Sequence, residues 1–139
     1  MEGERMKDVE FPDWRDIDEE HERLLEDYPD KRTGKRHRPV NFEKVIEAAR
    51  EQESIYNAAA VFFKEIGREH IYEDGNTSLA LVITKIFLHN NGKEFKPEEG
   101  ELLGRVINNH GLYDHKEIVR YLRTGEIDEQ KLPPKRKRS

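Results

Sequence analysis

The sequence predicts an all-α fold, a single compact helical domain of about six helices. Apolar residues recur at spacings of three and four along most of the chain, as they do on one face of a helix. Polar capping residues and glycines separate the resulting segments, and no useful length alternates apolar and polar residues as a strand does. A length of 139 residues also suits one domain better than two.

Composition excludes several classes of protein. The chain has no cysteine, which rules out a disulfide scaffold, thiol catalysis and a cysteine-based zinc site. Its longest apolar runs, such as residues 79–83, are far shorter than the ~20 residues that a membrane-spanning helix needs. Residues 1–5 are acidic and do not resemble a secretory signal. We therefore expect a cytoplasmic protein that does not associate with membranes.

Charge is distributed in blocks along the chain, although 40% of all residues are charged and the net charge is only -5. Residues 1–40 join an acidic stretch to a basic one, and most hydrophobic residues fall in 41–130. This pattern predicts a polar N-terminal extension with a short helix and a basic loop over 1–40. A helical domain follows over 41–130, and a basic disordered tail over 131–139.

The first three helices are predicted from their apolar spacing and their caps. A short amphipathic helix is expected over 16–28, with acidic residues in its first turns. Asn41 is a suitable N-cap for a helix over 42–53, and Ser54 for a helix over 55–69. The last of these is apolar nearly all round, which predicts a central position in the fold.

Three further helices follow. One is expected over 78–90, ended by Gly92 in the left-handed conformation. Pro97 suits the first position of the next helix, which extends to about Ile107. Asp114 is expected to cap the last helix, over 115–124, and Gly125 to end it.

Polar residues collect in segment 69–78, between the two most apolar helices. The start of a helix presents unpaired backbone N–H groups and the positive end of the helix dipole, which together attract anions. A glycine allows close approach of a ligand, and the polar side chains after it add donors. The predicted phosphate-binding residues are Gly75, Asn76, Thr77 and Ser78.

Two side chains of the same segment suit group transfer. His70 is placed to accept a proton from an attacking hydroxyl, and Asp74 to hold a divalent cation beside a phosphate. The same residues also fit a plain turn between helices, since Asp-Gly-Asn is a common turn sequence and Asn, Thr and Ser are ordinary caps. Spacing alone leaves both interpretations open.

Residues 70–76, His-Ile-Tyr-Glu-Asp-Gly-Asn, resemble the opening of the Fic/Doc family signature, His-x-Phe-x-(Asp/Glu)-(Gly/Ala)-Asn-(Gly/Lys)-Arg. The flanking segments are similar to those of Doc-like (death-on-curing) toxins. These segments are 54–59, 80–81, 87–92 and 124–127. The resemblance covers roughly residues 41–130 and implies an α-helical fold whose loop holds ATP and Mg²⁺.

The resemblance also implies roles for these residues. His70 would be the general base for a hydroxyl of a target protein, Asp74 the metal ligand, and Gly75 and Asn76 part of the phosphate cradle. Fic proteins usually transfer AMP, whereas Doc-type toxins transfer phosphate from ATP. The implied partners are a Phd-like antitoxin and a target such as a translation elongation factor.

The motif is degenerate, because Thr77 and Ser78 stand where the family has Gly or Lys followed by Arg. If the missing arginine only binds the nucleotide in its ground state, its loss weakens nucleotide binding by about 1.5–3 kcal/mol. If the arginine stabilises the transition state instead, its loss could lower the reaction rate by up to the ~10³–10⁵-fold that is typical of arginine fingers. The first case leaves an attenuated enzyme, and the second a catalytically inactive binding or regulatory protein. Lys85 lies too far along its helix to substitute, and we expect Lys64 and Arg68 to be solvated.

The remaining histidines and the basic clusters suggest little further chemistry. Histidines elsewhere in the chain, His115 among them, show no ligand-like spacing, so no structural zinc site is expected. The basic segments 31–38 and 135–138 have the charge that nucleic acid attracts. The negative net charge and the lack of a DNA-reading motif favour a solvated loop and tail instead.

Overall fold

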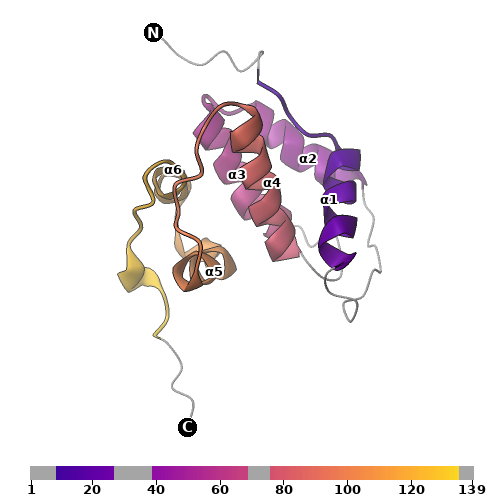
Figure 1. Cartoon of the computed structure of the whole chain (residues 1–139). Coiled ribbons are helices and arrows are strands. Elements are labelled where there is room, and N and C mark those ends of the chain that lie inside the picture. The colour runs from indigo at the N-terminus through magenta and orange to yellow at the C-terminus, as the bar shows by residue number, and fades with distance from the viewer. Residues whose placement is uncertain (1–8, 27–38, 69–75, 135–139) are drawn as a thin grey trace.

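The computed structural model describes residues 9–26, 39–68 and 76–134, and these form six α-helices and two short 3₁₀ turns (Figure 1). The all-α prediction is confirmed for this part of the chain. The helices are α1 (Trp14–Glu26), α2 (Pro39–Arg50), α3 (Ile55–Arg68), α4 (Asn76–Asn90), α5 (Glu101–Asn108) and α6 (His115–Thr124). The 3₁₀ turns are η2 (His110–Leu112) and η3 (Glu129–Lys131).

Helix α3 lies at the centre of the fold, as its sequence predicts. It packs against α2, α4 and α6, and α1 packs on the outer side of α4. Figure 1 shows α5 and α6 on one side of the α3–α4 pair and α1 and α2 on the other. The buried face of α3 combines small and aromatic side chains, all fully buried. They are Ala58, Ala59, Ala60, Phe62, Phe63 and Ile66.

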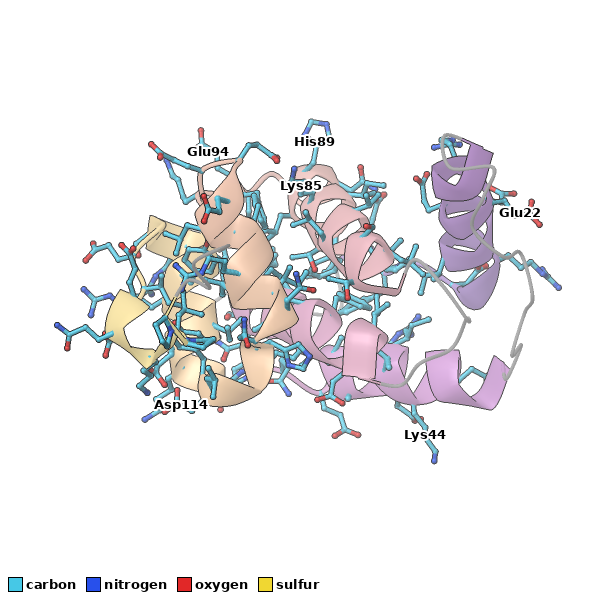
Figure 2. All side chains as sticks on the ribbon, turned by 90° about the horizontal axis from the view of Figure 1, so that it is seen from below. Glu22, Lys44, Lys85, His89, Glu94 and Asp114 are labelled. Atoms are coloured by element: carbon cyan, nitrogen blue, oxygen red, sulfur yellow. The ribbon has the colours of Figure 1, made fainter. Side chains whose placement is uncertain are left out.

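Aromatic rings join the helices in the core. The rings of Phe62 and Phe87 meet edge to face at 5.1 Å between α3 and α4, and those of Phe63 and Tyr121 at 6.4 Å between α3 and α6. In Figure 2 the side chains of Glu22, Lys44 and His89 point outward from α1, α2 and α4. In the described ranges no helix is both long enough and apolar enough to cross a membrane.

The core extends beyond the central helices at both ends of the described chain. Ile17 of α1 is fully buried against it, and Phe11 packs on it from the segment that precedes α1. Leu132, directly after η3, is also buried. The core therefore includes side chains from the acidic N-terminal part of the chain and from the segment just before the basic residues 135–138.

Several predicted helix ends are confirmed. The Ser54 hydroxyl accepts a hydrogen bond from the backbone N–H of Asn57 at 3.1 Å, at the start of α3. Asp114 caps α6 in a capping box with Glu117. Gly92, with φ of 72°, ends α4, and Gly125, with φ of 81°, ends α6. Such ends are predictable because each involves only residues a few positions apart.

The predicted start of α2 is wrong. Asn41 is not its N-cap, because the helix already begins at Pro39. Proline suits the first helical position, since its φ is already helical and its missing N–H would have no partner there. Helices α1 and α4 also begin two residues earlier than predicted, at Trp14 and Asn76. Asp13 caps α1 by accepting from the backbone N–H of Asp16 at 3.0 Å.

The predicted start of α5 is wrong as well. Pro97 is buried in a segment without regular secondary structure, and the helix begins only at Glu101. Two hydrogen bonds join this segment to other helices. The N–H of Lys96 donates to the carbonyl of Leu122 at 3.2 Å, and the Tyr56 hydroxyl donates to the carbonyl of Glu94 at 2.6 Å. Tertiary bonds thus outweigh the local helix signal.

Candidate functional site

The candidate site lies where α3 leads into α4. Helix α3 ends at Arg68 and α4 begins at Asn76, so the predicted catalytic residues fall between the two. His70, Asp74 and Gly75 lie outside the described residues, and so does the Asn76 side chain. Of the six predicted site residues, the structure describes the side chains of Thr77 and Ser78.

The first turn of α4 carries Asn76, Thr77 and Ser78. Thr77 is half-buried and Ser78 is exposed, whereas Leu79 and Ala80, which follow at once, are fully buried. These two residues belong to the hydrophobic core, and α4 packs against α3. The N–H groups of a first helical turn have no partner within the helix, so this end offers donors to an anion.

Lysine side chains near the site are engaged elsewhere. Lys64, one turn before the end of α3, is half-buried, and its ammonium donates to the carbonyl of Tyr113 at 2.9 Å. The prediction that Lys64 is solvated is therefore wrong, because the start of α6 covers it. Lys85 pairs with Glu99 and lies 5.4 Å from the Phe95 ring, in agreement with the prediction that it does not substitute for the missing arginine. The side chain of Arg68 lies outside the described residues.

A polar cluster between α3 and α6 was not anticipated from the sequence. The Asn57 amide donates to the Ser54 hydroxyl at 2.7 Å, and its oxygen is 2.8 Å from Nε2 of His115. Burial lowers the pKa of His115, and the nearby Lys64 lowers it further. Because 58 positions separate Asn57 from His115, no local pattern announces this contact.

Magnesium binding depends on Asp74, which the structure does not describe. Elsewhere, within the described ranges, no three His, Asp or Glu side chains gather as a metal site would require. Mg²⁺ is commonly held by one or two carboxylates together with substrate phosphates and water, so Asp74 is the residue of this segment that would hold it.

Comparison with known proteins adds no relative. No protein family, curated protein or solved structure matches this chain. The evidence for function therefore consists of the loop sequence and of the structure around the start of α4.

Proposed function

We propose that this protein is a Doc-like toxin that transfers phosphate from ATP·Mg²⁺ to a hydroxyl of a translation-related protein. The observation that carries the proposal is the segment 70–76, whose histidine, carboxylate, glycine and asparagine lead directly into α4. The polar first turn of α4, followed by fully buried residues, supports it, because a fixed helix N-terminus suits a phosphate.

In the proposed reaction His70 accepts the proton of the attacking hydroxyl as that oxygen bonds to the γ-phosphorus of ATP. The bond from this phosphorus to the β,γ-bridging oxygen breaks, and ADP leaves. Asp74 would hold Mg²⁺, which when bound would neutralise charge on the phosphates. Gly75 and Asn76, with the hydroxyls of Thr77 and Ser78, orient the phosphates. Positioning and charge stabilisation supply most of the catalysis in such reactions.

Phosphate transfer is preferred to AMP transfer because the flanking segments 54–59, 80–81, 87–92 and 124–127 resemble those of Doc-type toxins. AMP transfer would use the same base with the nucleotide turned, so that the α-phosphorus faces the hydroxyl. The position of the radiolabel on ATP separates the two reactions.

A specific observation favours a second candidate, an inactive binding or regulatory protein on the same fold. Ser78 is exposed in the first turn of α4, and its short hydroxyl cannot make the bidentate phosphate contact of an arginine. Lys64 and Lys85 are both occupied with other partners. In this case nucleotide affinity is low and no group is transferred.

The test compares the wild type with His70→Ala in a cell extract supplied with ATP labelled at the α- or the γ-phosphorus. We expect a labelled protein with γ-labelled ATP and the wild type, and none with His70→Ala. His89→Ala is the matched control, because His89 is an exposed histidine at the opposite end of α4. Equal labelling by wild type and His70→Ala, or no labelling with either nucleotide, contradicts the enzyme proposal.

The proposed antitoxin partner has its own test. Expression of the wild type alone should slow cell growth, and His70→Ala should not. Co-expression with a small protein encoded by a neighbouring gene should restore growth, and the two proteins should co-purify. Equal growth with wild type and His70→Ala would contradict toxicity through this site.

A further inference from the structure

A groove lies between α1 and α4, on the side of the molecule away from α5 and α6 (Figure 1). Its volume is about 500 Å³. It is lined by the segment that precedes α1, by the first half of α1 and by the second half of α4. The candidate catalytic site is at the opposite end of α4, so the groove is a separate feature.

The floor of the groove is apolar. Ile83, Ile86, Phe87 and Asn90 follow one another at helical spacing and form one stripe of α4. Ile83 and Phe87 are buried, whereas Ile86 is 37% exposed. The ring of Phe11 lies 5.3 Å from that of Phe87 and extends the apolar surface. Ile86 is thus a large hydrophobic side chain left partly uncovered beside the buried Ile83 and Phe87.

The rim of the groove is acidic. Among the described residues its charged lining consists of Glu10, Asp16, Glu19 and Glu20, and Arg50 lies 5.2 Å from the ring of Phe11, which also lines the groove. Two of these carboxylates have roles within α1, since Asp16 accepts from the N–H of Asp13 at 2.9 Å and Glu20 pairs with Arg23. Glu10 and Glu19 are exposed, and neither forms an ion pair within the part of the chain described. Two carboxylates without a cationic partner among the described residues therefore flank the apolar floor.

The backbone of the rim is held in place. Asn91 accepts a hydrogen bond from the N–H of Glu10 at 2.8 Å and donates to its carbonyl at 3.0 Å. The acidic surface continues across Pro12 into a shallower groove of about 320 Å³, which Glu43 and Glu47 of α2 line together with Arg50. Carboxylates thus line both grooves, along α1 and the segment before it and on α2, with Arg50 among them.

We propose that this groove binds a basic, amphipathic helix of a partner protein. Apolar side chains of such a helix would cover Ile86 and the floor, and its lysines or arginines would face Glu10 and Glu19. The complementary charge favours a cationic partner and speeds its association. The inference does not rest on the proposed function, because it uses none of the residues of segment 69–78.

The basic segments of this chain do not suit the groove. Arg105 of α5 donates to the carbonyl of Pro133 at 2.6 Å, and Figure 1 shows this end of the chain on the side opposite α1. Residues 31–38 and 135–139 lack any hydrophobic side chain to cover Ile86, whether they come from the same chain or from a second copy. A separate partner protein can supply both the positive charge and the apolar side chains that the groove requires.

The experiment measures binding of a fluorescein-labelled peptide of about 16 residues, a helix of leucine and lysine with one apolar face. Its counterpart carries glutamate in place of every lysine. Using fluorescence anisotropy, we expect the full-length protein to bind the basic peptide at least about tenfold more tightly than the acidic one. Raising the salt concentration from about 50 to 500 mM should weaken this binding, because exposed charges are screened.

Matched variants locate the binding. Glu10→Lys with Glu19→Lys, and separately Ile86→Glu, should each weaken binding of the basic peptide about tenfold. The charge control is Glu98→Lys with Glu129→Lys, and the apolar control is Leu112→Glu, at a residue 48% exposed in η2. These controls and His70→Ala should bind within about twofold of the wild type. Circular dichroism should confirm an unchanged fold for every variant.

Three results would overturn the inference. These are equal binding of the basic and acidic peptides, equal weakening by groove and control variants, and a dimer in sedimentation velocity that Ile86→Glu abolishes. The dimer would assign the groove to a second copy of this chain instead of a partner. Because ATP is absent from these measurements, failure of the phosphate-transfer proposal leaves their outcome unchanged.

Discussion

Residue 78 decides how strongly the proposed site can hold a nucleotide. Ser78 is exposed at the third position of α4, where an arginine side chain has room to extend. A positive charge near a helix N-terminus opposes the helix dipole and costs about 0.3–1 kcal/mol of stability. Any gain in nucleotide affinity from an arginine there must therefore come from contact with the phosphates.

The substitution Ser78→Arg should strengthen ATP binding about ten- to a hundredfold, the value of one charge-assisted hydrogen bond. Titration calorimetry with ATP and Mg²⁺ measures this change. His89→Arg adds the same charge at the other end of α4 and should leave ATP affinity unchanged. Equal affinity of Ser78→Arg and wild type would place the phosphates away from this turn.

The environment of His115 is not predicted by any local pattern in the sequence. Burial and Lys64 lower its pKa below the ordinary value of 6.5. The folded protein therefore binds a proton less readily than the unfolded chain. The stabilising effect of the neutral imidazole is complete above pH 6.5 and is lost as the pH falls through this value towards the folded pKa.

Urea unfolding at about pH 7.5 and pH 5.5 should show this loss of stability in the wild type. His115→Gln keeps a donor for Asn57 but does not titrate, so its unfolding free energy should fall less between the two pH values. His89→Gln, at an exposed position, should behave as the wild type does. An identical pH dependence in His115→Gln would show that other groups cause the effect.

At the scale of single helices, the agreement between sequence and structure depends on how local each signal is. Ser54, Asp114 and Gly125 act within four residues of a helix end, and all three have their predicted roles. Pro97 fails as a helix start because bonds from Lys96 and to Glu94 come from distant parts of the chain. A capping signal is dependable where no such tertiary bond competes with it.

Two glycines allow this argument to be tested. Gly125 has φ of 81°, and a Cβ atom there would lie 3.1 Å from the carbonyl oxygen of Lys96. Gly125→Ala should therefore lower the free energy of unfolding by about 1–2 kcal/mol or more. Gly104 lies inside α5, where a Cβ would meet no atom within 4 Å. Gly104→Ala should raise the free energy of unfolding by about 0.5–1 kcal/mol.

Thermal and urea unfolding of the two alanine variants measures both changes. We expect the free energy of unfolding to fall in Gly125→Ala and to rise in Gly104→Ala, although both replace glycine by alanine. If both variants lost stability equally, the left-handed conformation of Gly125 would not be the cause.

At the scale of the whole molecule, α3 joins the two sides of the fold. Phe62 of this helix is fully buried and meets Phe87 of α4. Phe62→Ala removes a large buried side chain and should cost about 3–5 kcal/mol of stability. Leu112→Ala is the control, because an exposed leucine should change stability by less than about 0.5 kcal/mol.

Chemical denaturation followed by far-ultraviolet circular dichroism tests this prediction. A single cooperative transition is expected, since α3 contacts α2, α4 and α6 and couples them. A separate early transition in Phe62→Ala would show that the helices on the two sides unfold independently.

The sequence by itself determined the helical class, the apolar faces and the helix ends that depend on neighbouring residues. It also determined the resemblance of segment 70–76, on which the proposed function rests. Tertiary structure alone decided that Lys64 turns to Tyr113, that His115 meets Asn57, and that α1 and α4 enclose an acidic groove. Local bonds follow from chain order, whereas these contacts join residues dozens of positions apart and exist only when the helices pack.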